Sequence, residues 1–174
     1  MTVSEAQRDM RRAYVGGGPG AIVSALVWLG AFFALRNSDT AHAFFVLFVG
    51  GMFIFPVSML ICRAVFRRAK EEAGNGLGMT ALESTIAMIA GLFGSWLFLK
   101  LEPAFVFPFA AIAVGTHYFA FRTVYGDGLF WVLGAVLTAL GVWQILGSAV
   151  PGGVILWVAG VEFVFGAILT ARAL

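Results

Sequence analysis

The chain has 174 residues, of which 61% are hydrophobic and only 11% are charged, and its mean hydropathy is +0.96. Soluble domains are about 45–50% apolar and about 25% charged, so a water-soluble fold of this size could not bury so much apolar surface. The net charge of +2 is too small to indicate nucleic-acid binding, and one cysteine with two histidines excludes a disulfide within the chain, a cysteine-based zinc site and a His-rich metal cluster.

Residues 2–14 are polar, but they are patterned as a short amphipathic helix. Thr2 with Glu5 has the spacing of a capping box, and so has Ser4 with Gln7. Apolar residues recur at helical spacing with arginines on the other faces: Val3, Ala6, Met10 and Ala13 against Arg8, Arg11 and Arg12. We expect this helix to lie on the membrane surface.

The run of glycine and proline over residues 16–20 ends that helix and predicts a hinge. It lacks the Gly-Lys-Ser/Thr ending of a phosphate-binding loop and follows no strand. The sequence therefore divides into an interfacial segment, residues 1–20, and a transmembrane domain, residues 21–174.

Six apolar stretches follow, and each is read as a helix that crosses the hydrocarbon core of a bilayer, about 30 Å thick. They cover residues 21–35, 43–62, 79–99, 104–121, 129–146 and 154–171. Pro56 should kink the second helix. The pairs Arg67 with Glu71 and Arg68 with Glu72 predict that residues 66–78 extend it briefly. An uncharged turn is expected over residues 147–153. The predicted fold class is an all-α polytopic membrane bundle of six helices plus a short N-terminal amphipathic helix.

Basic residues are distributed unequally between the two ends of this bundle. Six spans place both termini on one side, together with nine of the eleven Lys and Arg residues, while Arg36 and Lys100 lie opposite. The positive-inside rule then makes both termini cytoplasmic. Tryptophan and tyrosine near the helix ends are expected to anchor the bundle at the two interfaces: Trp96 and Trp143 outside, Tyr14, Tyr118, Tyr125 and Trp131 inside.

The sequence pattern allows two other interpretations, a cleaved signal peptide and an internal duplication. The arginine-rich lead, the first apolar run and the Ala-His-Ala of residues 41–43 could form a cleaved signal peptide, but the polar lead is long and a second apolar run follows at once. The Phe-x-Phe-Pro of residues 53–56 recurs at residues 105–108, yet the two prolines lie at different depths. We interpret this repeated motif as a similarity of composition and not as evidence of a duplicated helical hairpin.

Several short segments, spread over most of the chain and densest in its first half, resemble a bacterial family of small multi-span membrane proteins known only as a domain of unknown function. They are DMRRAY at 9–14, Gly16-Gly17 with Pro19-Gly20, SALVWL at 24–29, GGM at 50–52 with Pro56, and ALE at 81–83. The resemblance implies a bacterial inner-membrane protein. It brings no activity, substrate, cofactor or catalytic residue.

Ionisable side chains inside a membrane cost about 2.5–3.5 kcal/mol each on insertion scales, so they mark the candidate sites. Glu83 follows the start of its span by about four residues, and His117 precedes the end of the next, antiparallel span by about four, which predicts similar depth and a contact between them. Arg122, with Tyr118 at i,i+4, could join this pair. A proton or ion relay is the functional interpretation, and a hydrogen bond that locks two helices is the commoner one.

Glu162 lies close to the middle of the sixth span, with Ala159 and Gly166 on the same side. One interpretation is a carboxyl that couples protons or a cationic substrate to transport. The other is a neutral acid bonded to Thr138, Gln144 or a backbone carbonyl. The sequence leaves both open.

Three functional classes remain. The first is an integral membrane protein with a structural or regulatory role, the second a small proton- or ion-coupled transporter or channel, and the third, least supported, a membrane-embedded enzyme. No serine has the Gly-x-Ser-x-Gly setting of a hydrolase. The expected partners are the lipid bilayer and a second copy of the chain. The small-residue pairs Gly91 with Ser95 and Gly134 with Thr138 have the spacing of helix contacts, and they fit packing between copies and packing within one chain equally well. Neither nucleic acid nor any particular soluble partner is indicated.

Overall fold

The computed structural model describes residues 1–147 and 152–174. Seven α-helices and two short 3-10 turns lie in these residues. They are α1 (Val3–Ala13), η1 (Val15–Gly17), α2 (Gly18–Asn37), α3 (Thr40–Ala64), α4 (Leu77–Leu101), η2 (Pro103–Phe105), α5 (Val106–Tyr125), α6 (Leu129–Leu146) and α7 (Ile155–Ala173). The turn expected over residues 147–153 lies mostly outside the described residues.

Six of these helices, α2 to α7, are long and apolar enough to cross a membrane, which confirms the predicted fold class. The most apolar of them, α3, has a mean hydropathy of 2.4 over its best 18 residues, yet only 17% of those residues are buried. For α4 the buried share is 11%. Apolar helices so poorly covered by protein need another apolar solvent, and a bilayer supplies it.

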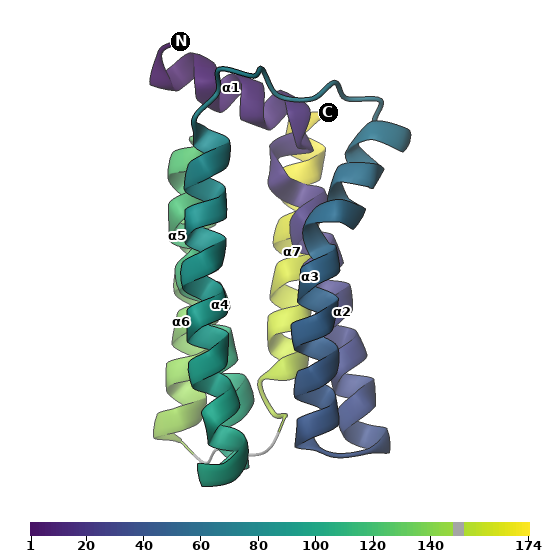
Figure 1. Cartoon of the computed structure of the whole chain (residues 1–174), viewed down its shortest axis with the longest axis vertical. Coiled ribbons are helices and arrows are strands. Elements are labelled where there is room, and N and C mark those ends of the chain that lie inside the picture. Colours follow the sequence, from purple (N-terminus) through teal and green to yellow (C-terminus); the bar gives the residue numbers. More distant parts are fainter. Residues whose placement is uncertain (148–151) are drawn as a thin grey trace.

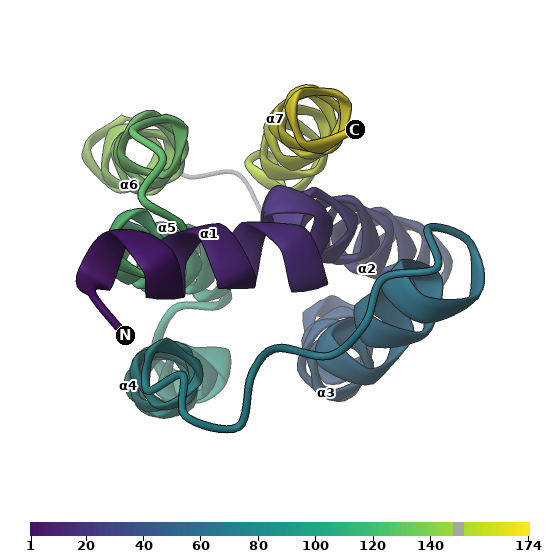
Figure 2. The same ribbon diagram turned by 90° about the horizontal axis from the view of Figure 1, so that it is seen from above.

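The helices form two groups of three, one made of α2, α3 and α7 and the other of α4, α5 and α6 (Figures 1 and 2). Within the first group α2 packs against both α3 and α7, and within the second α5 packs against both α4 and α6. Contacts between the groups are fewer. Both termini lie at the same end, where α1 crosses the ends of the long helices (Figure 2).

Glycines allow the closest helix contacts within each group. A Cβ on Gly18 of α2 would lie 2.2 Å from Thr170 Oγ1 and 2.6 Å from the Gly166 carbonyl oxygen of α7. Between α5 and α6, a Cβ on Gly115 would lie 2.6 Å from Thr138 Oγ1 and 2.9 Å from the carbonyl oxygen of Gly134. Small residues let membrane helices approach in this way.

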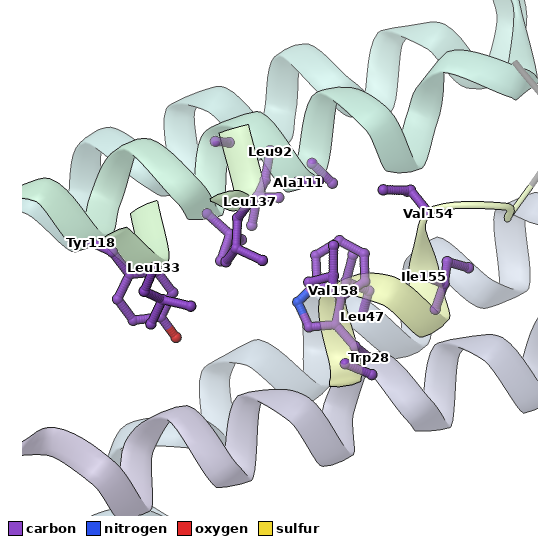
Figure 3. Close-up of a cluster of buried hydrophobic side chains, with 14 of the residues drawn as sticks. Trp28, Leu47, Leu92, Ala111, Tyr118, Leu133, Leu137, Val154, Ile155 and Val158 are labelled. Atoms are coloured by element: carbon purple, nitrogen blue, oxygen red, sulfur yellow. The ribbon is translucent and has the colours of Figure 1, made fainter. Parts of the chain in front are cut away.

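Large apolar side chains join the two groups. Trp28 of α2 and Phe107 of α5, both fully buried, lie with ring centroids 6.5 Å apart, and Phe48 of α3 and Phe93 of α4 lie 5.5 Å apart. Figure 3 shows side chains from both groups meeting in one buried cluster. This cluster is the core into which the polar groups described below are set.

The first helix is closed at its N-terminus by the predicted capping box: Glu5 N–H donates to Thr2 Oγ1 at 3.3 Å, and Thr2 N–H donates to Glu5 Oε2 at 2.7 Å. Helix α1 lies across the end of the bundle, and its position at the membrane surface stays a prediction. Its buried face, which includes Asp9, packs across the bundle end, and Gln7 Nε2 donates to the Thr123 carbonyl of α5 at 2.8 Å. Val3, assigned to the apolar face, is 65% exposed.

The long helices depart from the prediction at two places. Helix α2 begins at Gly18 rather than at residue 21, because Pro19 in its first turn needs no intrahelical donor. Helix α3, which contains Pro56, bends near its C-terminal end, as predicted (Figure 1). The expected extension over residues 66–78 does not form, since α3 ends at Ala64 and Arg67 has φ +54.

The segment that follows α3 is held by α1 instead of by i,i+4 pairs. Asp9 accepts from the Glu72 N–H at 2.9 Å, from Asn75 Nδ2 at 2.9 Å and from Arg12 Nη2 at 2.5 Å. Tyr14 donates to Glu71 Oε2 at 2.8 Å. The Glu71 carboxylate and the Glu72 backbone N–H are therefore bound by Tyr14 and Asp9, a tertiary interaction that local spacing could not reveal.

We expect Asp9→Asn to loosen α1 and residues 65–76 together, at a cost of about 1–3 kcal/mol in local stability. Burial acts to raise the pKa of Asp9, but the donors of Asn75, Glu72 and Arg12 outweigh it and hold the pKa below its ordinary value of about 3.9. The stabilisation is thus present above that value and is lost as the pH falls below it. Hydrogen exchange of the α1 amides at neutral and acid pH checks this. Glu5→Gln, which keeps a capping box, should exchange like the wild type.

Candidate functional site

Glu162 is the most deeply buried ionisable side chain of the described residues, with an exposed fraction of 0%. It lies on the buried face of α7 together with Ala159 and Gly166, as predicted. Seven residues separate it from the start of α7 and eleven from the end. At about 1.5 Å per residue it lies roughly 16 Å from the end of the bundle that carries α1.

Tyr118 of α5 provides the hydrogen bond to this carboxyl, donating to Glu162 Oε1 at 2.8 Å. Its ring is buried and stacks on Phe130 at 6.2 Å and, edge to face, on Phe121 at 5.8 Å. Tyr118 lies at one end of the buried cluster in Figure 3. Since helical side chains incline toward the N-terminus of their helix, Tyr118 extends toward the depth of Glu162. Its hydroxyl is a buried polar link between the two groups of helices.

Ser24 of α2 completes the arrangement. It is 5% exposed and interacts with both Tyr118 and Glu162. The second carboxyl oxygen, Oε2, has no hydrogen-bond partner among the described residues. No lysine or arginine is paired with Glu162 in the described part of the chain. The carboxyl therefore sits among hydroxyls and apolar side chains, a setting in which a net negative charge is costly.

The other predicted site residues are not brought together. Glu83 is exposed at the surface of α4, so the expectation that it points into the bundle and meets His117 is wrong. His117 Nδ1 instead lies 2.8 Å from the Oγ of Ser84, the residue next to Glu83, and its ring packs edge to face on Phe121 at 4.4 Å. A contact between α4 and His117 does form at the predicted depth, but Ser84 makes it and Glu83 does not.

Arg122 lies away from both centres. Its side chain is exposed, and its guanidinium lies 5.7 Å from the ring centroid of Trp131. Among the predicted anchors, Trp131, Trp96 and Trp143 are at least half exposed, whereas Tyr118 and Tyr125 are buried in the core and anchor nothing at an interface.

Sequence reasoning found Glu162 and missed its partners. From the sequence, Tyr118 is predicted at the membrane interface and beside the Glu83–His117 pair, and Ser24 is predicted in no site. Three helices that are distant in the sequence contribute these residues, so no spacing within one helix could group them. A signal was nevertheless available, because serine and tyrosine inside apolar spans need polar partners.

Six apolar helices in two packed groups, with a buried carboxyl at their junction, define a polytopic membrane protein. The chain belongs to DUF7010, a family of unknown function whose model matches residues 3–172. No curated protein and no solved structure matches it.

Proposed function

We propose that the protein is a small proton-coupled membrane transporter in which Glu162 carries the proton. The observation that carries this proposal is the fully buried Glu162 at the junction of the two helix groups, bonded to Tyr118 and paired with no lysine or arginine of the described residues. Ionisable groups in the membrane interior are costly and mark proton or ion pathways. The proton would rest on Glu162, with Tyr118 as donor to one oxygen and Ser24 beside the carboxyl.

The division of the helices into two groups provides a way for Glu162 to become accessible from either side of the membrane. Packing is extensive within each group and weaker between them, where α6 meets α7 and α3 meets α4. Relative movement of two such groups around a central site is how many transporters expose that site to alternate sides. The structure would then be the closed form, since Glu162 has no exposed surface.

The charge distribution supports an orientation for this transporter. Nine of the eleven basic residues lie at the end of the bundle that carries α1 and both termini. Under the positive-inside rule that end faces the cytoplasm, and the resemblance noted above fits a bacterial inner membrane.

A structural role is the competing proposal, and the same contact supports it. A hydroxyl–carboxyl bond between α5 and α7 could simply hold the two groups together, because polar side chains often join membrane helices. The two proposals differ in one respect: a carrier must exchange its proton with water, whereas a structural bond need not.

The test is a pH jump applied to the reconstituted protein on a solid-supported membrane. The wild type should give a transient current as protons reach the buried carboxyl, and Glu162→Gln should reduce that current at least tenfold. The amide keeps an oxygen that can accept from Tyr118, so the fold should be retained. Glu83→Gln, which removes an exposed carboxylate on α4, is the matched control and should behave as the wild type. A silent wild type, or an undiminished current in Glu162→Gln, contradicts the proposal.

A further inference from the structure

A basic pocket lies at the end of the bundle where α1, η1 and α7 meet. Its volume is about 280 Å³, many times the roughly 30 Å³ that one water occupies in the liquid. The polar side chains that line it are Arg11, Arg12, Arg68, Arg172 and Asp127. Four guanidinium groups thus face one carboxylate.

Two of these arginines are neutralised within the protein. Arg12 Nη2 lies 2.5 Å from Asp9 Oδ1, and Arg172 Nη1 lies 3.3 Å from Asp127 Oδ2. Arg11 and Arg68 form no such ion pair in the described part of the chain.

Arg11 and Arg68 make bonds that bring no negative charge. Arg11 donates to the Tyr125 carbonyl and Arg68 Nη2 to the Ala173 carbonyl at 3.2 Å. Neither forms an ion pair with a described carboxylate. The Nε of Arg68 is also buried and has no hydrogen-bond partner among the described residues. A buried donor without an acceptor is destabilising, and an anion in the pocket would supply that acceptor.

The backbone keeps this pocket open beside α7. Gly16 has φ +63, and a Cβ there would lie 3.2 Å from the Leu169 carbonyl oxygen and 3.3 Å from the Cβ of Ala173. A side chain at this position would be both strained and crowded. Glycine therefore lets the turn between α1 and α2 sit against the last turns of α7, with the arginines around it.

We propose that this pocket binds a phosphate group. Guanidinium groups present several N–H donors in a plane and pair with phosphate oxygens in two-pronged fashion. The pocket lies at the level of the helix ends, where lipid headgroups lie, and basic pockets between membrane helices bind anionic headgroups. The phosphate can come from such a lipid or from solution, and the two sources share the same chemistry at the protein.

Binding to the purified full chain tests the proposal with two probes. Cys62, the single cysteine, is 2% exposed, so a thiol-reactive dye reports unfolding. We expect phosphatidylglycerol, but not phosphatidylcholine, to raise the unfolding temperature by several degrees, and native mass spectrometry to retain the anionic lipid. Inorganic phosphate at millimolar concentration raises the same temperature only if the site also accepts phosphate from solution.

The variant Arg11→Gln/Arg68→Gln, which removes the two guanidinium groups without a carboxylate partner, should lower lipid affinity at least tenfold. Arg8→Gln, on α1 but outside the pocket, and Arg36→Gln, at the opposite end, are matched controls and should bind as the wild type. Arg68→Gln alone should fold, with an intermediate loss of affinity, if the double variant does not. Failure of both probes to stabilise the wild type, or equal losses in controls and pocket variants, overturns the proposal.

Discussion

Replacing Gly18 by leucine is expected to reduce the yield of folded, monodisperse protein at least tenfold. The first atom of any side chain at this position would lie 2.2 Å from Thr170 Oγ1, 2.5 Å from the Thr170 backbone nitrogen and 2.6 Å from the Gly166 carbonyl oxygen. Two of these three atoms are backbone, so no rotamer change relieves the clash, and α2 must move away from α7. Overpacked sites commonly cost about 1–3 kcal/mol, and a backbone clash should exceed that range.

The matched control for this substitution is Gly51→Leu, since nothing lies within 4 Å of a Cβ on Gly51 and leucine is favourable beside lipid. Both variants add the same side chain to an apolar helix, and only one adds it to a helix contact. Thr170→Ala combined with Gly18→Leu should recover little, because the nitrogen and carbonyl remain. Size-exclusion profiles and dye-reported unfolding temperatures provide the measurement. Equal loss in the two glycine variants would refute the close α2–α7 contact.

The prediction from the sequence succeeded wherever a property belongs to one helix. Residues 129–146 were bounded as the structure has them, because a run of apolar residues between glycine-containing turns is a purely local signal. The capping box of Thr2 and Glu5 is local in the same way. The prediction that Glu162 lies on the buried face of α7 was also correct, since the small residues beside it define that face.

Failures arose where one helix contacts another. The packing of α1 across the bundle end depends on Asp9, a charged residue that hydropathy assigns to the surface but that is buried and accepts from three donors. The pairing of Ser84 with His117 differs from the predicted Glu83 contact by one residue, about 100° around the helix. Rotation of that size is set by packing against α5, which spacing along α4 does not encode.

We expect the hydrogen bond donated by Tyr118 to contribute more to the free energy of unfolding than the hydrogen bond of any other single hydroxyl in the bundle. Tyr118→Phe should lower the free energy of unfolding by about 1–3 kcal/mol, because the phenyl ring refills the volume but leaves Glu162 Oε1 without its donor in a site sealed from water. Tyr125→Phe is the matched control: that side chain is also buried and stacks on Phe130 at 5.1 Å, but its hydroxyl makes no hydrogen bond with the described residues.

A double-mutant cycle isolates the bond from the packing around it. Glu162→Leu alone should leave the Tyr118 hydroxyl without an acceptor, whereas Tyr118→Phe/Glu162→Leu removes both polar groups and should be less destabilised than the sum of the single variants. Dye-reported unfolding of the four proteins in the same detergent gives the coupling. Strict additivity would mean that the carboxyl and the hydroxyl do not meet at this depth, and the junction between the two helix groups would then be apolar throughout.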